Sequence, residues 1–257
     1  MSSGLSSTAG EIVMFPCLED NYAFLVRDHA SGDVMTVDTP DADAIWEVLE
    51  RRGWPLTYIV NTHWHEDHVG GNLALKARTG ARVIAPAIET ARIPGIDIAT
   101  EDGATISLGS LTVRAMATGG HTLGHMSFYL PDLDAVFVGD TMFVMGCGRI
   151  FEGTPGMMWH SLQKLAALPE CTQVYCAHEY SAANARFALS VDQGDATVER
   201  ANEIFSLRNL GVPTVPTTIG LERRTNPFLH LSTLVEDDGD DSAVARFAEL
   251  RKAKDRF

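Results

Sequence analysis

The stretch Asn61–Gly71, NTHWHEDHVGG, limits what this chain can fold into more than any other segment. It places three histidines and two acidic residues in six consecutive positions. The short apolar run before it, Leu56–Val60, is typical of a β-strand, so the cluster begins where a strand ends. Such loops are where binding and catalytic side chains concentrate. The coordinating side chains follow an HxHxDH pattern: His63, His65, Asp67 and His68.

This pattern suits metal ions. On a loop after a strand, His63 and His65 can converge on one cation, while Asp67 and His68 face a second. Neutral imidazole binds zinc, iron and similar metals, and carboxylate oxygens complete the shell. The alternative is a polar loop or a helix cap, which explains most isolated histidines and aspartates. So many coordinating groups in so short a stretch favour the metal site. Trp64 and Glu66 lie between the ligands and are given no role.

The rest of the chain offers further ligands. They are His121 in GGHTLGH, Asp140 in VFVGDT and His178 in VYCAHEY, and each follows or ends an apolar run. A carboxylate at Asp140 could bridge two ions at the roughly 3.5–4 Å separation of two-metal catalytic sites. The sequence therefore predicts two divalent metal ions per chain. Zinc is the default expectation, with iron or manganese as alternatives.

Composition narrows the class of protein. A chain of 257 residues with 45% hydrophobic content can bury a full core and a small second domain. Its formal net charge of −14 argues against a nucleic-acid partner. The first ten residues lack the features of a targeting signal, and no run is apolar enough to cross a bilayer. The four cysteines form no CxxC pair. We expect a cytoplasmic monomer without a membrane partner.

The apolar pattern predicts an α+β fold in two domains. Strand-like runs occur within 11–38 and 104–138, with helices over 41–53, 71–80 and 158–168 and a strand over 172–177. From about residue 180 the pattern is helical, over 181–191, 197–210 and 242–257, around a Pro-rich connection at 212–220. The acidic segment 236–241, EDDGDD, is expected to be a solvated loop. We expect a catalytic domain over 1–180 and a mainly helical domain over 181–257.

The metal motifs, HxHxDH followed by GHTLGH, GDT and a late histidine, resemble the metallo-β-lactamase superfamily. This resemblance implies an αβ/βα sandwich of two sheets flanked by helices over about residues 11–180. The superfamily includes lactamases, lactonases, nucleases and thioesterases, so the metal site alone does not name the substrate.

Further segments resemble the glyoxalase II family, the hydroxyacylglutathione hydrolases. They are PCLEDNYAFLV, FVGDTMFVMGCGRIFEGT, YCAHEYSAANARFA, TNPFL and RKAKDRF. The resemblance implies that residues matching His63, His65 and His121 bind the first metal, those matching Asp67, His68 and His178 bind the second, and Asp140 bridges them. It implies hydrolysis of S-lactoylglutathione to glutathione and D-lactate, in methylglyoxal detoxification, by a hydroxide held between the metals. Asp67 could orient that hydroxide.

The same resemblance places a glutathione site. The positions that match the family's glutathione contacts are Arg149, Tyr180, Arg251 and Lys254. Phe151 is also expected to bind the substrate, and it stands where some members have tyrosine. His230 stands where a basic residue is common. The alternatives are a glutathione persulfide dioxygenase or another metal-dependent thioesterase or lactonase of the superfamily; a nuclease is disfavoured by the negative charge.

Overall fold

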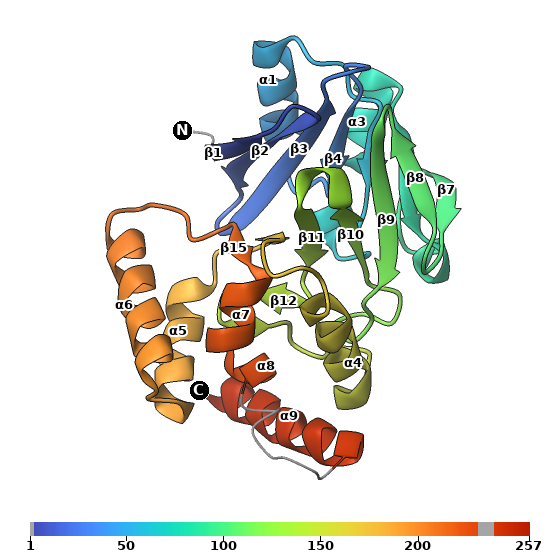
Figure 1. Cartoon of the computed structure of the whole chain (residues 1–257). Helices are drawn as coiled ribbons and strands as arrows, with labels where there is room; N and C mark the ends of the chain where they lie inside the picture. The colour runs from blue at the N-terminus through green and yellow to red at the C-terminus, as the bar shows by residue number, and fades with distance from the viewer. Residues whose placement is uncertain (1–2, 231–238) are drawn as a thin grey trace. The chain divides into compact units, whose positions relative to one another are not determined.

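The computed structural model describes residues 3–230 and 239–257, which form two compact units. The first unit contains the chain up to Ala117 together with Gly124–Gly139. The second contains Thr118–Leu123 and Asp140–Phe257. Most elements of both units are labelled in Figure 1. The predicted division at residue 180 stays a prediction.

The first unit is built on a mixed sheet whose strands lie in chain order, β1 to β7. Its strands are β1 Ser3–Ser6, β2 Gly10–Cys17, β3 Asn21–Asp28, β4 Val34–Val37, β5 Tyr58–Val60, β6 Arg82–Pro86 and β7 Ile96–Thr100. Pairing is antiparallel from β1 to β4 and parallel from β4 to β7. The connecting helices are α1 Ala42–Arg52, α2 Glu66–Val69, α3 Asn72–Thr79 and the short 3-10 turn η1 Ala87–Glu89.

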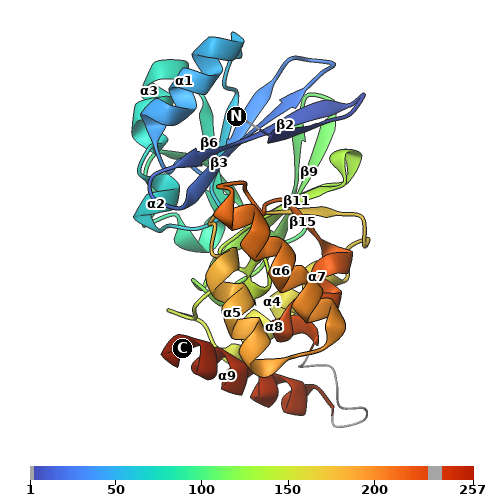
Figure 2. The same ribbon diagram turned by 90° about the vertical axis from the view of Figure 1, so that its left-hand side faces the viewer.

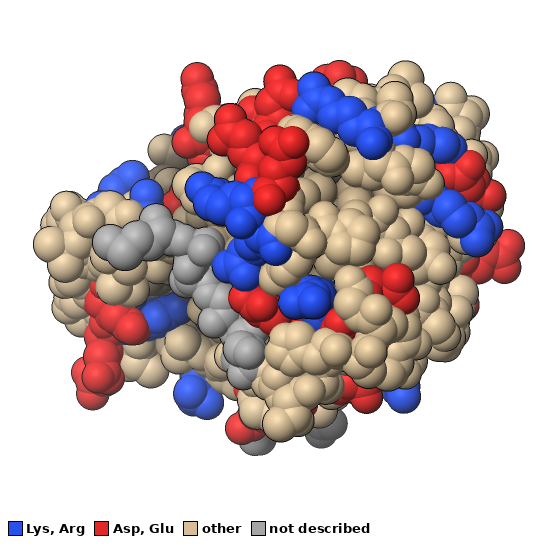
Figure 3. Space-filling model, turned by 90° about the horizontal axis from the view of Figure 1, so that it is seen from above, with Lys and Arg blue, Asp and Glu red and all other residues tan. Residues whose placement is uncertain are grey.

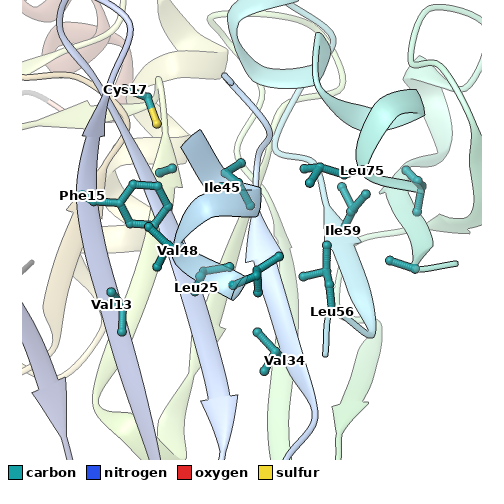
Figure 4. Close-up of a cluster of buried hydrophobic side chains, with 14 residues drawn as sticks. Val13, Phe15, Cys17, Leu25, Val34, Ile45, Val48, Leu56, Ile59 and Leu75 are labelled. Carbon is teal, nitrogen blue, oxygen red and sulfur yellow. The ribbon is translucent and has the colours of Figure 1, made fainter. Parts of the chain in front are cut away.

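Helix α1 begins and ends where the sequence predicts. The Asp41 carboxylate accepts hydrogen bonds from the first backbone amides of the helix, and Gly53 stops it with a φ of 63°, a left-handed conformation that glycine adopts without strain. Its apolar face, with Ile45 and Val48, packs with Leu75 of α3 against one face of the sheet (Figure 4). Burial of these side chains contributes about 1.5–3 kcal/mol each.

A second, antiparallel sheet faces the other side of the first one. Within the first unit its strands are β8 Thr105–Leu108, β9 Leu111–Ala117, β10 Met126–Leu130 and β11 Ala135–Gly139, with the 3-10 turn η2 at Pro131–Leu133. Phe24 of β3 meets Phe137 of β11 edge-on, with ring centroids 5.3 Å apart. Two sheets with helices on an outer face are the α+β arrangement expected from the sequence.

Parallel pairing brings two strand ends to one place. Val37 of β4 lies opposite Val60 of β5, and both strands run in the same direction. Their carboxyl ends therefore lie at the same edge of the sheet, where sites of such sheets usually lie. Asp38 directly follows β4, and its amide donates to the carbonyl of Val60 at 2.8 Å. The histidine cluster that follows β5 is thus delivered beside Asp38.

The second unit is mainly helical. Its elements are β12 Met142–Phe143, β13 Gly146–Cys147, α4 Pro155–Ala166, β14 Gln173–Cys176, α5 Ser181–Val191, α6 Asp195–Asn209, β15 Thr217–Thr218, α7 Ile219–Thr225, α8 Pro227–His230 and α9 Gly239–Arg256. Helices α5 and α6 lie side by side (Figure 2). The short β12–β13 hairpin is held from α7: the buried Glu222 carboxylate accepts from the amide of Met145, and the Asn226 amide donates to the carbonyls of Phe143 and Gly146.

Two segments differ from the sequence predictions. Helix α7 begins at Ile219, inside the connection over 212–220, and helix α8 follows it; neither helix was predicted. Helix α7 is capped by Thr218, whose hydroxyl accepts from the Leu221 amide. Residues 239–241 of the predicted acidic loop are helical, because Asp240 and Asp241 stand in the first turn of α9, where negative charge is favoured. Residues 236–238 lie outside the described residues.

Charge is mixed on the surface seen in Figure 3, where groups of acidic side chains lie next to groups of basic ones. Ion pairs such as Arg52–Glu11 at 2.8 Å and Lys76–Asp97 at 2.6 Å are examples of this pairing in the first unit. Among the described residues, no helix combines the length and the apolar character that crossing a membrane would require.

The buried Asp28 at the end of β3 generates a stability prediction. Its carboxylate accepts from the amides of Ser31 and Ser110 and from the Ser110 hydroxyl, so it ties β3 to the β8–β9 turn. Burial opposes its ionisation, but these hydrogen bonds outweigh burial and hold the pKa of this carboxyl well below its usual range.

We predict that Asp28→Asn lowers the free energy of unfolding at pH 7 by about 2 kcal/mol, the scale of hydrogen bonds to a charged group. Because the pKa is depressed on folding, this stabilisation is complete above the unfolded-state value of about 3.9 and is lost as the pH falls below it. Urea denaturation at pH 7 and at lower pH checks this. The difference in the free energy of unfolding between wild type and Asp28→Asn should shrink in acid. The control Glu47→Gln, on the exposed surface of α1, should unfold with nearly the wild-type free energy at both pH values. Equal gaps at both pH values would contradict the assignment.

Candidate metal centre and substrate pocket

Asp38 organises the candidate ligands of the first unit. Its Oδ1 accepts from the backbone amide of Thr62 at 2.7 Å, and its Oδ2 accepts from the Thr62 hydroxyl at 2.8 Å. The same Oδ2 lies 2.8 Å from Nδ1 of His68. A carboxylate only accepts, so Nδ1 of His68 carries the proton and Nε2 presents a lone pair. Asp38 has a φ of 58°, an uncommon backbone conformation for a residue other than glycine.

His63 is oriented in the same way through Thr62. Its Nδ1 lies 3.0 Å from the Thr62 hydroxyl oxygen. That hydroxyl already donates its one proton to Asp38, so it must accept from Nδ1–H of His63. Nε2 of His63 is then a lone-pair donor, and it lies 3.0 Å from Nδ1 of His65. Two ring nitrogens this close share either a proton or a cation.

Asp67 and His65 complete the set from the first unit. Asn21 donates to Oδ2 of Asp67 at 3.1 Å, which orients this partly exposed carboxylate. The same Oδ2 lies 3.4 Å from Nε2 of His68. His63 and His68 are fully buried, whereas His65 and Asp67 are only partly buried. All four sequence-predicted side chains of this unit therefore gather at the end of β5.

Asp140 lies between the two candidate histidines of the second unit. Its Oδ2 lies 3.4 Å from Nε2 of His121, and its Oδ1 lies 3.4 Å from Nε2 of His178. The other ring nitrogen of His121 donates to the carbonyl of Arg149 at 2.8 Å, which leaves Nε2 to act as a ligand. Asp140 thus offers one oxygen to each histidine, the arrangement that a bridging carboxylate needs.

The distances fit metal binding better than hydrogen bonding. Three pairs of candidate ligand atoms within the units are 3.4 Å apart. This exceeds the 2.7–3.2 Å range of ordinary N–H···O hydrogen bonds. It matches the roughly 3.3 Å that separates two ligands of a tetrahedral ion with metal–ligand bonds of about 2.0–2.1 Å. The fixed tautomers and these spacings show that the residues fit divalent metal ions.

A cavity of about 300 Å³ in the second unit collects the predicted substrate contacts. It is lined by all five of them: Arg149, Phe151, Tyr180, Arg251 and Lys254. His121 and Asp140 line the same cavity. Tyr180 stacks flat on His178, with ring centroids 4.8 Å apart, and Phe151 meets His121 edge-on at 5.2 Å. Residues far apart in sequence therefore share one pocket beside the second unit's candidate ligands.

The pocket carries more positive than negative charge. Arg251 is buried, donates to the Cys147 carbonyl at 2.8 Å and pairs with Asp255 at 3.0 Å. Asp255 also lies 3.4 Å from Arg149. Burial and, after it, the nearby Arg251 lower the pKa of Lys254, so its charged form is penalised. An anionic ligand would relieve that penalty. Arg251 and Lys254 contact separate carbonyls here, those of Cys147 and Ala183, rather than one shared partner.

Other residues weighed from the sequence have structural surroundings. Burial raises the pKa of the Cys147 thiol to about 11 despite the adjacent Arg251, so it is no thiolate nucleophile. His125 is fully buried, with its ring centroid 4.9 Å from that of His63. Sequence reasoning missed Asp38, Thr62 and Asn21, which orient ligands. The only available signal for Asp38 was a polar residue at a strand end.

Comparison with protein families places the chain in a known class. Residues 21–178 match the metallo-beta-lactamase superfamily, and residues 179–257 match the C-terminal region of hydroxyacylglutathione hydrolase. The fold agrees with solved structures of this kind. The chain is similar to ETHE1 from Myxococcus xanthus, with a TM-score of 0.67 and 23% identity over 97% of this chain and 91% of that one. It is also similar to the BLEG-1 B3 metallo-beta-lactamase, with a TM-score of 0.65 and 22% identity over 85% and 99%.

The chain therefore has the metallo-β-lactamase fold of a metal-dependent hydrolase, with a helical C-terminal region. Sequence relatives narrow this class. The hydroxyacylglutathione hydrolase of Maricaulis maris (strain MCS10) is 50% identical over 96% of this chain and 98% of its own length. That of Brucella anthropi is 51% identical over 96% and 97%. The chain belongs to the hydroxyacylglutathione hydrolase family.

The contacts of Asp38 generate a prediction about metal affinity. In Asp38→Asn, an NH2 group replaces one of the two carboxylate oxygens. That NH2 group can only donate, so it cannot accept the hydrogen bond that Thr62 or His68 now donates to this position. We expect metal affinity to fall 10–100-fold, the usual effect of losing a partner that orients a ligand. Competition with a chelating dye measures it. Asp43→Asn, on the exposed surface of α1, is the matched control; unchanged affinity in both variants would show that Asp38 does not orient the ligands.

Proposed function

We propose that the chain hydrolyses the thioester of S-(2-hydroxyacyl)glutathione, with S-lactoylglutathione giving glutathione and D-lactate. The observation that carries this proposal is the combination of two matches along one chain: a metal-dependent hydrolase domain and a hydroxyacylglutathione hydrolase C-terminal region. Relatives of that name are about half identical over nearly the full length. The role in methylglyoxal detoxification follows from that substrate.

The proposed metal centre has two divalent ions, most simply zinc. Seven side chains of ligating type support it: His63, His65, Asp67, His68, His121, Asp140 and His178. His63, His65 and His121 would hold one ion, and Asp67, His68 and His178 the other, with Asp140 shared. The position of Asp140, with one oxygen toward each of His121 and His178, supports the shared role. Iron or manganese also suits this mixed nitrogen and oxygen set.

When bound, the ions would acidify the attacking water and polarise the thioester carbonyl. Residues of the chain would hold the reacting groups around these ions. Asp67 is oriented by Asn21 and would accept a hydrogen bond from the attacking water. Glutathione would leave as a thiolate, and a thiol with a pKa near 8.5 needs little help from a general acid. The function therefore requires no proton donor beyond solvent.

The pocket of the second unit would bind the glutathione part of the substrate. Arg149, Arg251 and Lys254 supply positive charge for its carboxylates, in a chain whose net charge is −14. Tyr180 offers a hydroxyl, and Phe151 offers an exposed ring without one. Asp255 partly neutralises two of the cations and fixes their direction. The alternative of a persulfide dioxygenase or other thioesterase is not adopted, because the close relatives carry the hydroxyacylglutathione hydrolase name.

The direct test is hydrolysis of S-lactoylglutathione by purified protein, followed by loss of thioester absorbance, with metal content measured on the same sample. Rapid turnover with about two metal ions per chain supports both the substrate and the two-metal centre. No turnover despite full metal loading would contradict the proposed substrate and direct the search to other thioesters.

We predict that Asp140→Ala abolishes turnover and reduces bound metal, because the shared ligand is lost. A fall of at least 10³-fold in kcat is expected, since positioning and charge stabilisation fail together. Steady-state kinetics and metal analysis measure the two effects. Asp195→Ala, an exposed aspartate at the start of α6, is the control. Near-normal turnover with two ions still bound would refute the shared role of Asp140.

We predict that Arg251→Gln and Lys254→Gln mainly raise KM for the glutathione thioester, because these side chains contact the non-reacting part of the substrate. An increase of about tenfold each corresponds to the loss of one charge-assisted contact. Lys252→Gln is a matched control, because Lys252 is an exposed cation on the same helix. Unchanged KM in both pocket variants would remove them from the substrate site.

A further inference from the structure

Trp64, which lies between two candidate ligands in the chain, contacts one of them through its ring. The ring centroids of Trp64 and His65 are 4.4 Å apart, with an interplanar angle of 76°. The guanidinium carbon of Arg92 lies over the same indole, 3.3 Å from the ring centroid. Trp64 also packs against the small apolar cluster of Val69 and Ile93. The indole of Trp64, which has no metal-coordinating atom, thus lies between the candidate ligand His65 and the guanidinium of Arg92, which comes from a different loop.

The environment of His65 explains why such a contact matters. His63 and His68 are fully buried and are held by Thr62 and Asp38, whereas His65 is only partly buried. The His65 ring contacts the rings of Trp64 and His63, and both contacts are close to perpendicular. A metal ligand must have its ring plane fixed to keep affinity high. Edge-to-face packing is one way to fix it.

Arg92 is suited to holding the indole in turn. A guanidinium is flat and always charged, and it stacks on an aromatic face more effectively than a lysine ammonium. At 3.3 Å from the centroid, Arg92 is in full contact with the indole face. Arg92 follows η1, whereas Trp64 follows β5, so this contact joins the ligand loop to another part of the same unit.

We infer that Trp64 and Arg92 form a positioning stack that holds the His65 ring in the orientation needed for metal binding. Neither residue touches substrate or metal; both act through His65. The inference rests on the proposed function, in which His65 is a metal ligand. It adds two residues that the metal motif itself does not define.

The experiment uses the full chain loaded with zinc, and measures zinc affinity by competition with a chelating dye. Arg92→Gln and Trp64→Leu should each weaken the more readily released ion about tenfold, the lower end of effects seen when a ligand loses its orienting partner. Their combination should weaken it little further, because both act through one stack. Trp64→Phe keeps an aromatic ring beside His65 and should retain most of the affinity.

The chain provides a matched control. Arg52 lies over Trp54 in the same unit, with its guanidinium carbon 4.6 Å from the ring centroid. Arg52→Gln removes the same kind of stack outside the candidate metal ligands and should leave zinc affinity unchanged. In metal-free protein, NMR should show the His65 ring proton shifted by the indole ring current in wild type and in Arg52→Gln, and that shift should be lost in Arg92→Gln.

The outcomes separate this inference from the proposed function. If His65→Ala weakens zinc binding but Arg92→Gln and Trp64→Leu bind zinc as wild type does, the positioning stack is wrong and the metal centre stands. If His65→Ala also binds zinc normally, both the stack and the proposed ligand role of His65 are wrong. A loss in Arg52→Gln equal to that in Arg92→Gln would show general destabilisation and would overturn the inference as well.

Discussion

The arrangement of the candidate ligands in the first unit depends on one buried carboxylate, Asp38. It accepts from the Thr62 amide and hydroxyl and from His68, and through Thr62 it also fixes His63. This is possible because β4 and β5 are parallel and adjacent, so that their carboxyl ends meet at one edge. Burying a carboxylate without hydrogen-bond partners would cost free energy of folding. Each hydrogen bond that Asp38 accepts also fixes either the tautomer of a histidine or the position of the loop that carries the candidate ligands.

The second unit meets a different requirement, because an anionic glutathione ligand must be held by a protein with a net charge of −14. The charge close to the ligand differs from the charge of the whole chain. Cations from the segment after β13 and from the end of α9 line one cavity, while Asp255 balances part of their repulsion. Electrostatic interactions are strongest at short range and with buried groups such as Arg251. The three pocket cations therefore act on a bound anion more strongly than distant exposed acidic groups, whose charge salt and water screen. Overall charge therefore says little about what this pocket prefers.

Much of the fold was predictable because its elements are marked locally. Four strands, at 105–108, 111–117, 126–130 and 135–139, occupy the region over 104–138 where apolar runs between Gly, Pro and Asp predicted strands. Helix α1 has both its Asp cap and its closing Gly. Helices α7 and α8 were missed because the preceding segment is rich in proline, which favours a loop. The Thr218 cap of α7 and the Asn226 side chain, which accepts from the Phe228 amide, were therefore not recognised as helix-start signals. The candidate ligands were predictable because histidines and aspartates, which are common metal ligands, cluster in the sequence at 63–68. Asp38 and the Arg92–Trp64 contact were not, because each depends on strand pairing or packing between distant segments.

The two kinds of site residue should therefore respond differently to substitution. The candidate ligands of the first unit are held by buried hydrogen bonds and ring contacts at strand ends, where a small displacement would change metal affinity. Two of the pocket cations, Arg251 and Lys254, stand on α9. Lys254 and the adjacent Asp255 are only partly buried, so their surroundings can adjust at little cost to the core. Changes near the end of α9 should thus alter substrate preference while leaving metal binding intact. Placing substrate-binding cations on a different element from the ligand loop allows one metal-dependent fold to serve different substrates.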